Sequence, residues 1–304
     1  MGQRGAWHLA RLAGIDLYLH WTWFIVLLVE YRDRGHAYAS PVWNLLEILA
    51  LFAIVTLHEF GHALACRKVG GHANRILLSP FGGIAYVDPP VRPGATLCTI
   101  CAGPLVNVIL APILFFAMRA AVTPAITLGS VDLYLFARAV YAINLGLLIF
   151  NILPVYPLDG GQILRSLLWY PLGRAKSLWV SSMIGFVGVA GLFLLSWWLR
   201  DLWLAAITVF ILIYCWKGLE SARALWKMSQ LPRHDGLACP WCQSPPPAVP
   251  LWHCGHCRQN FDVFASNGAC PSCHVRTPQI PCPLCGHSNP APAWSAAVAA
   301  PVAG

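Results

Sequence analysis

The sequence predicts an α-helical polytopic membrane protein with about six transmembrane helices, a small β-hairpin loop and a C-terminal zinc-ribbon domain. Three observations lead to this fold class. Of the 304 residues, 58% are hydrophobic and only 11% are charged, whereas soluble domains carry about 25% charged residues. Long apolar stretches recur as far as residue 216. After residue 232, cysteines occur in four closely spaced pairs.

The apolar stretches mark the candidate spans. Each is close to the roughly 20 residues that an α-helix needs to cross a bilayer. They cover residues 15–31, 42–66, 95–122, 131–153, 177–199 and 202–216. We therefore expect a membrane domain over residues 15–231, preceded by a short arm at residues 1–14.

The distribution of lysine and arginine predicts the orientation, because cytoplasmic loops are enriched in these residues. With the amino terminus inside, twelve basic residues before the cysteine-rich region fall on the inner side and five on the outer side. Both termini are therefore expected in the cytosol. The net charge of +8 then reflects topology, and nucleic acid is not an expected partner. Arg233, Arg258 and Arg276 are too few for a nucleic-acid surface.

The motif His58-Glu59-Phe60-Gly61-His62 lies inside the second predicted span. On a helix, its two histidines share one face, where both imidazoles can bind one zinc ion. Glu59 remains free to act as general base on a zinc-bound water. Ionisable residues at membrane depth are costly and therefore candidates for function. The motif predicts a metalloprotease site within the membrane.

Two histidines need a third protein ligand, and the segment 151–161 offers one. Pro154 and Pro157 cannot continue the fourth span as a helix. Broken helices are tolerated at membrane depth where they line a cavity, so Asp159 can enter such a cavity as a ligand. Asn151 carries an amide that could bind a substrate backbone or a developing oxyanion. The alternative is a plain cytoplasmic Pro-Asp-Gly turn.

With these residues, the chain resembles the site-2 protease family of intramembrane zinc metalloproteases. The resemblance rests on residues 58–62 and 151–160, with weaker matches at 14–22 and 102–107, and covers about residues 10–230. It implies His58, His62 and Asp159 as zinc ligands and Glu59 as the catalytic carboxylate. It also implies membrane-anchored protein substrates and, from the breadth of the family, a bacterial cell membrane.

A rival reading keeps the metal but drops catalysis. A membrane scaffold or metal-responsive regulator could use the same fold. Glu59 argues against it, because a structural zinc ion does not need this carboxylate.

Residues 76–87 predict a short β-hairpin around Gly82 and Gly83. An extended substrate could add to its edge as a further strand. A re-entrant loop that only seals the site is the alternative. The spacing of Gly103 and Asn107 mainly predicts close helix packing, although it could also bring Asn107 near the site.

The cysteine-rich region at residues 232–290 predicts a double zinc ribbon. Four Cys-x-x-Cys pairs suffice for two tetrahedral sites of four thiolates each; they are Cys239 and Cys242, Cys254 and Cys257, Cys270 and Cys273, and Cys282 and Cys285. A cytosolic location argues against disulfides, and iron–sulfur ligation is the alternative. We expect a region that folds only with metal and binds a cytosolic protein partner or gates the protease. The Ala- and Pro-rich tail at residues 291–304 is expected to be disordered.

Overall fold

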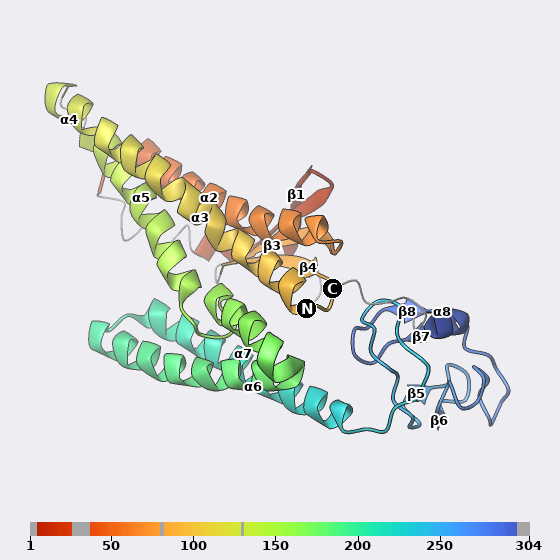
Figure 1. The fold of residues 1–304 in the computed structure, drawn as a ribbon. Coiled ribbons are helices and arrows are strands. Elements are labelled where there is room, and N and C mark those ends of the chain that lie inside the picture. The colour runs from red at the N-terminus through yellow and green to blue at the C-terminus, as the bar shows by residue number, and fades with distance from the viewer. Residues whose placement is uncertain (1–4, 26–36, 80–81, 129–130, 297–304) are drawn as a thin grey trace.

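The computed structural model describes residues 5–25, 37–79, 82–128 and 131–296 (Figure 1). Within this part of the chain, five helices are long and apolar enough to cross a membrane. They are α2 (Pro41–Lys68), α3 (Pro93–Ala120), α5 (Val131–Ile152), α6 (Asp159–Leu199) and α7 (Leu202–Ser229). The short helix α4 (Val122–Leu128) continues α3. The described residues thus hold five candidate spans rather than about six.

The first predicted span is wrong for residues 15–20, because these form a strand. Strand β2 (Ile15–His20) alternates buried Ile15 and Leu17 with more exposed Asp16 and Tyr18. This period of two is typical of a half-buried strand. The rest of the predicted span, apart from residues 21–25, lies outside the described residues.

A four-stranded sheet covers one side of α2. Strands β1 (Ala6–Leu12), β2, β3 (His72–Ser79) and β4 (Gly82–Asp88) lie in that order. The pair β2–β3 is parallel, and the other two pairs are antiparallel. The predicted hairpin is therefore present as β3 and β4, with β4 at one edge. Residues 6–12 of the expected arm form the opposite edge strand.

The sheet and α2 are held together by an apolar core and by the hydrogen bonds of one arginine. Ile15, Ile76 and Leu78 pack with Ala63 and Cys66 of α2, all fully buried. In the last turn of α2, the Arg67 guanidinium donates hydrogen bonds to the carbonyl oxygens of Ala13, Gly14 and Ala73 at 2.5–2.8 Å. The end of α2 is thereby fixed against the β1–β2 turn and strand β3.

Helix α3 lies at the centre of the membrane domain and contacts α2, α5 and α6. Figure 1 shows α6 and α7 side by side below the other long helices. The predicted break in the fourth span is present, since α5 ends at Ile152 and α6 begins at Asp159. Helix α6 is itself interrupted at Gly173, whose φ of 75° is not helical.

The cysteine-rich region contains two short hairpins, each enclosing one Cys-x-x-Cys pair. Strand β5 (Trp252–His253) pairs with β6 (Asn260–Phe261), and β7 (Ile280–Pro281) pairs with β8 (Ser288–Asn289). Apart from the cysteines, the core is a few side chains, among them Trp252, Phe261 and Trp294.

We expected disorder from residue 291, but residues 291–296 form helix α8 (Ala291–Ala296). Trp294 explains the difference: its side chain is fully buried and packs edge-on against Phe264 at 4.9 Å between ring centroids. Its carbonyl oxygen also accepts a hydrogen bond from the Ala238 amide. One large apolar side chain thus orders a segment whose average composition indicates disorder. Residues 297–304 lie outside the described residues.

The close approach of α2 and α3 predicts a stability effect. A methyl group at Gly61 would lie 2.6 Å from the Ala102 carbonyl oxygen, whereas one at Gly146 in α5 would meet nothing within 4 Å. We expect Gly61→Ala to destabilise the protein by about 1–3 kcal/mol and Gly146→Ala to cause no loss. Unfolding in detergent measures both variants. Equal stability of the two would show that α2 and α3 do not pack this closely.

Candidate metal centre

Three side chains from two helices converge on one point. His58 and His62 lie on the buried face of α2, and Asp159 is the first residue of α6. The Nε2 atoms of the histidines are 3.2 Å apart. The Asp159 Oδ2 atom lies 3.0 Å from Nε2 of His58 and 3.4 Å from Nε2 of His62. Both histidines are only 5% exposed.

The hydrogen bonds of the two Nδ1 atoms determine whether the Nε2 atoms can bind a metal ion. His58 Nδ1 donates to Asn107 Oδ1 at 2.6 Å, and His62 Nδ1 donates to the Thr99 carbonyl oxygen at 2.9 Å. Each Nδ1 therefore carries a proton, so in the neutral form of each ring Nε2 presents a lone pair toward the centre. Three lone pairs facing one another in a buried site repel unless a cation lies among them.

The arrangement fits Zn²⁺. Tetrahedral ligands at about 2.0–2.1 Å from zinc stand roughly 3.3 Å from one another, which matches the separations of 3.0–3.4 Å found here. Histidine ligands of zinc commonly donate their other N–H to a carbonyl or carboxylate, as both do here. The residues present can therefore hold zinc with a fourth position open.

Asn107 is fixed by a second amide. Its Nδ2 donates to Asn144 Oδ1 at 2.9 Å, and Asn144 Nδ2 donates to the Asn107 carbonyl oxygen at 3.0 Å. Both asparagines are fully buried. The sequence indicated mainly packing for Asn107 and gave no role to Asn144. The sequence did contain a signal for this contact, because Asn107 and Asn144 each place an amide inside an apolar span.

Glu59 is buried beside the three convergent groups but is not one of them. Its Oε2 accepts a hydrogen bond from the Ala85 amide of β4 at 2.8 Å. A methyl group at Gly83 would lie 2.1 Å from the Glu59 side chain. The edge strand therefore lies directly against this carboxylate, and only glycine fits at that point.

Asn151 is placed differently from the other candidates. It lies in the last turn of α5 and is half-buried. Among the described residues, no hydrogen bond joins its amide to either histidine or to Asp159. The structure thus brings together His58, His62, Asp159 and Glu59, and it leaves Asn151 near the chain break.

The eight paired cysteines form two separate groups of four. The first pair lies beside the fourth, in a group of Cys239, Cys242, Cys282 and Cys285. The second pair lies beside the third, in a group of Cys254, Cys257, Cys270 and Cys273. Sulfur atoms across each group are 3.5–3.7 Å apart. This is far beyond the S–S bond length of about 2.05 Å and close to the roughly 3.8 Å between thiolates bound to one zinc ion.

Hydrogen bonds within the first group favour ionisation of one thiol. Those from Cys239 and Cys282 lower the pKa of Cys242 well below its usual range. A thiolate is the form that binds metal. The group is therefore suited to a divalent cation.

The first cysteine group also contacts the membrane domain. The Arg174 guanidinium on α6 donates to the Leu284 carbonyl oxygen, between Cys282 and Cys285, at 2.9 Å. His287 lies 3.6 Å from Asp88 at the end of β4 and stacks on Trp241 at 4.2 Å between ring centroids. The cysteine-rich region therefore contacts both α6 and the base of the β3–β4 hairpin.

Comparison with known proteins gives consistent relatives. The model of peptidase family M50 matches residues 46–131 and 120–195. The zinc metalloprotease MJ0392 of Methanocaldococcus jannaschii is 35% identical over 182 residues, covering 58% of this chain and 50% of that protein. The putative zinc metalloprotease sll0528 of Synechocystis is 31% identical over 185 residues, covering 57% and 47%. The chain thus spans about half the length of these curated relatives.

A solved structure shares the fold. The site-2 protease from Methanocaldococcus jannaschii superposes with a TM-score of 0.51 at 27% identity, covering 70% of this chain and 95% of that one. The family match includes the histidine motif, the Asp159 segment and most of the candidate spans. With the metal centre described above, these matches show that the chain is a multi-pass membrane protein and belongs to peptidase family M50, the site-2 protease family.

Proposed function

We propose that this protein is an intramembrane zinc endopeptidase that hydrolyses peptide bonds in or near the transmembrane segments of membrane-anchored proteins. One observation carries the proposal: Glu59 lies beside His58, His62 and Asp159 without belonging to the ligand group. A scaffold or metal-responsive regulator on the same fold, the second candidate, would need the three ligands but no carboxylate beside them.

The residues divide the work of hydrolysis. When bound by His58, His62 and Asp159, zinc would lower the pKa of a water molecule and polarise the substrate carbonyl. The Ala85 amide holds Glu59 Oε2, and Oε1 is the atom that accepts the proton and passes it to the leaving amine. Asn107 and the Thr99 carbonyl keep the two imidazoles in the ligand tautomer. Asn151 is the proposed donor to the substrate backbone, on its position beside the break before Asp159.

Strand β4 is the proposed binding edge for the substrate. It has β3 on one side only, and the Ala85 amide points away from β3 toward Glu59. An extended substrate that paired with this edge would bring a peptide bond to Glu59. Strand addition would also satisfy the backbone groups that a substrate helix exposes when it unwinds.

The cysteine groups are the proposed sites of two structural zinc ions. Their spacing supports this assignment, and such a small core needs metal to fold. We assign the region a gating role or the binding of a cytosolic protein, because its first group contacts the base of the hairpin and α6. The excess of Lys and Arg at the corresponding helix ends supports cytosolic termini, and the breadth of the family is the basis for proposing a bacterial cell membrane.

Replacing the proposed base tests the function. Glu59→Gln removes the proton acceptor and should lower cleavage of a single-span model substrate in detergent by about 10²–10⁴-fold, with the zinc content unchanged. Glu220→Gln is the matched control, because Glu220 is an exposed carboxylate on α7. Cleavage of the substrate at the same rate by Glu59→Gln and wild type would rule out the proposed mechanism.

Removing the amide behind His58 should weaken the metal centre. Asn107→Ala leaves His58 Nδ1 without its acceptor, so zinc affinity at this site should fall about 10–100-fold. Chelator titration of the purified protein measures the loss. Asn44→Ala is the control, since Asn44 is a buried asparagine of α2 whose amide makes no hydrogen bond to any residue that the structure describes. An identical chelator profile for Asn107→Ala and wild type would contradict the role of Asn107.

Metal analysis separates the three sites. We expect three zinc ions per chain, because the three groups use different ligands. Asp159→Ala, Cys282→Ser and Cys270→Ser should each remove one zinc ion, whereas Cys98→Ser on α3 should remove none. Purification with iron in place of zinc, or loss of all three ions from any single variant, would contradict the assignment of independent zinc sites.

A further inference from the structure

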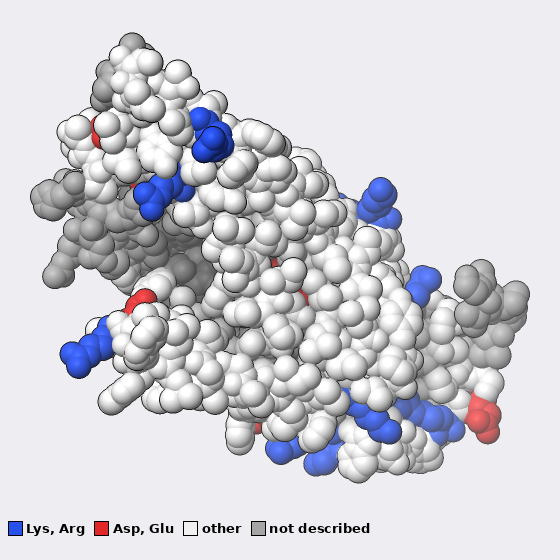
Figure 2. All heavy atoms as spheres, turned by 60° about the vertical axis from the view of Figure 1, so that its left-hand side comes forward, with Lys and Arg blue, Asp and Glu red and all other residues white. Residues whose placement is uncertain are grey.

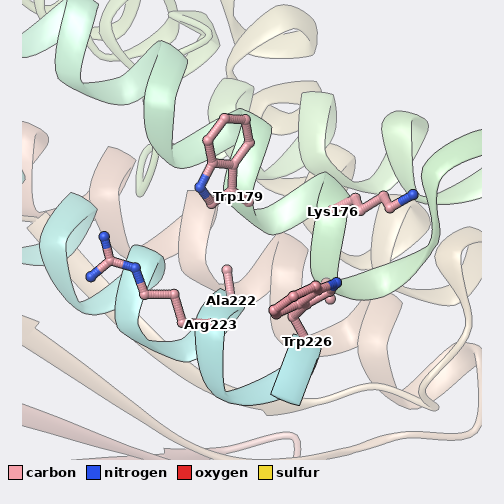
Figure 3. Close-up of a pocket in the computed structure, with 6 residues that line it drawn as sticks. Lys176, Trp179, Ala222, Arg223 and Trp226 are labelled. Atoms are coloured by element: carbon pink, nitrogen blue, oxygen red, sulfur yellow. The ribbon is translucent and has the colours of Figure 1, made fainter. Parts of the chain in front are cut away.

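A cavity of about 250 Å³ lies between α6 and α7, away from the metal centre. Figure 3 shows its lining residues: Lys176 and Trp179 come from α6, and Ala222, Arg223 and Trp226 come from α7. Trp179 and Trp226 are about half exposed. Indole rings and alanine side chains thus form most of the wall, with a cation on each side.

A second, more polar cavity of about 440 Å³ adjoins the first. The two cavities share Ala175, Lys176 and Trp226. The second also reaches Arg174 and Arg233, and it extends to the cysteine-rich region at Cys242, Ser244 and Leu284. An aromatic cavity therefore opens into a cationic one. This pair of cavities is complementary to an amphiphile with an apolar tail and an anionic head.

The cations around the two cavities are not neutralised by acidic side chains. Within the described part of the chain, no carboxylate forms an ion pair with Lys176 or Arg223. Arg233 donates to the carbonyl oxygens of Pro245 and Met228, which do not offset its charge. Arg174 donates to the Leu284 carbonyl oxygen and lies beside the first cysteine group, whose thiolates partly offset its charge. Figure 2 shows lysines and arginines gathered at the lower end of the molecule, below a largely uncharged body. Lys176, Arg223 and Arg233 thus present positive charge to the cavities that no carboxylate of the described residues pairs with.

The positions of the lining residues along α6 and α7 place the cavities at a membrane surface. From the Arg200–Asp201 turn, Lys176 is 24 residues away along α6 and Arg223 is 22 residues away along α7. At about 1.5 Å per residue these distances are roughly 36 and 33 Å, slightly more than the hydrocarbon thickness of about 30 Å. Phosphate groups lie at this level, and tryptophan is enriched there.

We propose that the two cavities together bind an anionic phospholipid of the surrounding bilayer. Its phosphate lies where the two cavities meet, between Lys176 and Arg223, and an acyl chain runs past Trp179 toward the hydrocarbon core. Basic pockets between transmembrane helices at the cytoplasmic side suit such headgroups. The lipid contacts both α6 beside Gly173 and the cysteine-rich region, so it stabilises their contact through Arg174.

Photocrosslinking tests the proposal on the zinc-loaded full-length protein in bilayer nanodiscs. Phosphatidylglycerol and phosphatidylcholine, each with the same photoreactive acyl chain, are compared at equal mole fraction. Mass spectrometry locates the lipid on tryptic peptides of α6 and α7. Phosphatidylglycerol should label the Trp179 and Trp226 peptides several-fold more than phosphatidylcholine does. Labelling needs no proteolysis, so its result is independent of the proposed activity.

Charge variants make the test specific. Lys176→Gln combined with Arg223→Gln should lower phosphatidylglycerol labelling by roughly 25-fold, at about 1 kcal/mol or a factor of five per cation. Lys176→Arg should preserve it. The matched control, Lys217→Gln with Lys227→Gln, removes the same charge from exposed positions of α7 outside the cavities and should leave labelling unchanged.

Three results would overturn the lipid assignment. Equal labelling by the two lipids would show a groove without headgroup preference. An equal loss in the control pair would show only general attraction to an anionic surface. Loss of labelling with millimolar inorganic phosphate in the buffer would identify a site for free anions instead.

Discussion

The metal centre depends on one electrostatic constraint: three lone pairs face one another within 3.4 Å, in a site almost closed to water. The hydrogen bonds behind the histidines favour this arrangement, because each fixes Nδ1 as a donor and leaves Nε2 of the neutral ring as the metal-binding atom. Such a site is unfavourable by itself and becomes favourable around a divalent cation. A cation bound here would also join α2 to α6, because His58 and His62 lie on α2 and Asp159 begins α6.

Helix α3 supplies the template for this arrangement. Thr99, Gly103 and Asn107 follow one another at intervals of four residues and therefore lie on one face of the helix. The Thr99 carbonyl binds His62, and Asn107 binds His58. A methyl group at Gly103 would lie 2.2 Å from His62 Nε2, so glycine leaves room for the imidazoles between the two bonds. The spacing of α3 thus repeats that of His58 and His62 on α2.

Local patterns in the sequence predicted which side chains would converge, whereas contacts between distant segments had to come from the structure. The spacing of His58 and His62 defines a helix face, and Pro154 and Pro157 marked the break that frees Asp159. His62 donates to the backbone carbonyl of Thr99, and such a contact cannot be predicted from the residue type because every residue has this group. The cysteine pairs were visible, but their combination, first with fourth, depends on how the hairpins fold back. Strand β2 and helix α8 were missed because average composition hid an alternation in one and a single buried tryptophan in the other.

The proposed base, Glu59, and the proposed third ligand, Asp159, belong to different parts of the membrane domain, and this has a consequence for control. Glu59 is held by β4, whereas Asp159 begins α6. The first cysteine group contacts the end of β4 through His287 and α6 through Arg174. It therefore bridges the two elements whose relative position defines the site. A change in the metal content of this group, or in the molecule that fills the cavity beside Arg174, would act on both elements without touching the catalytic zinc.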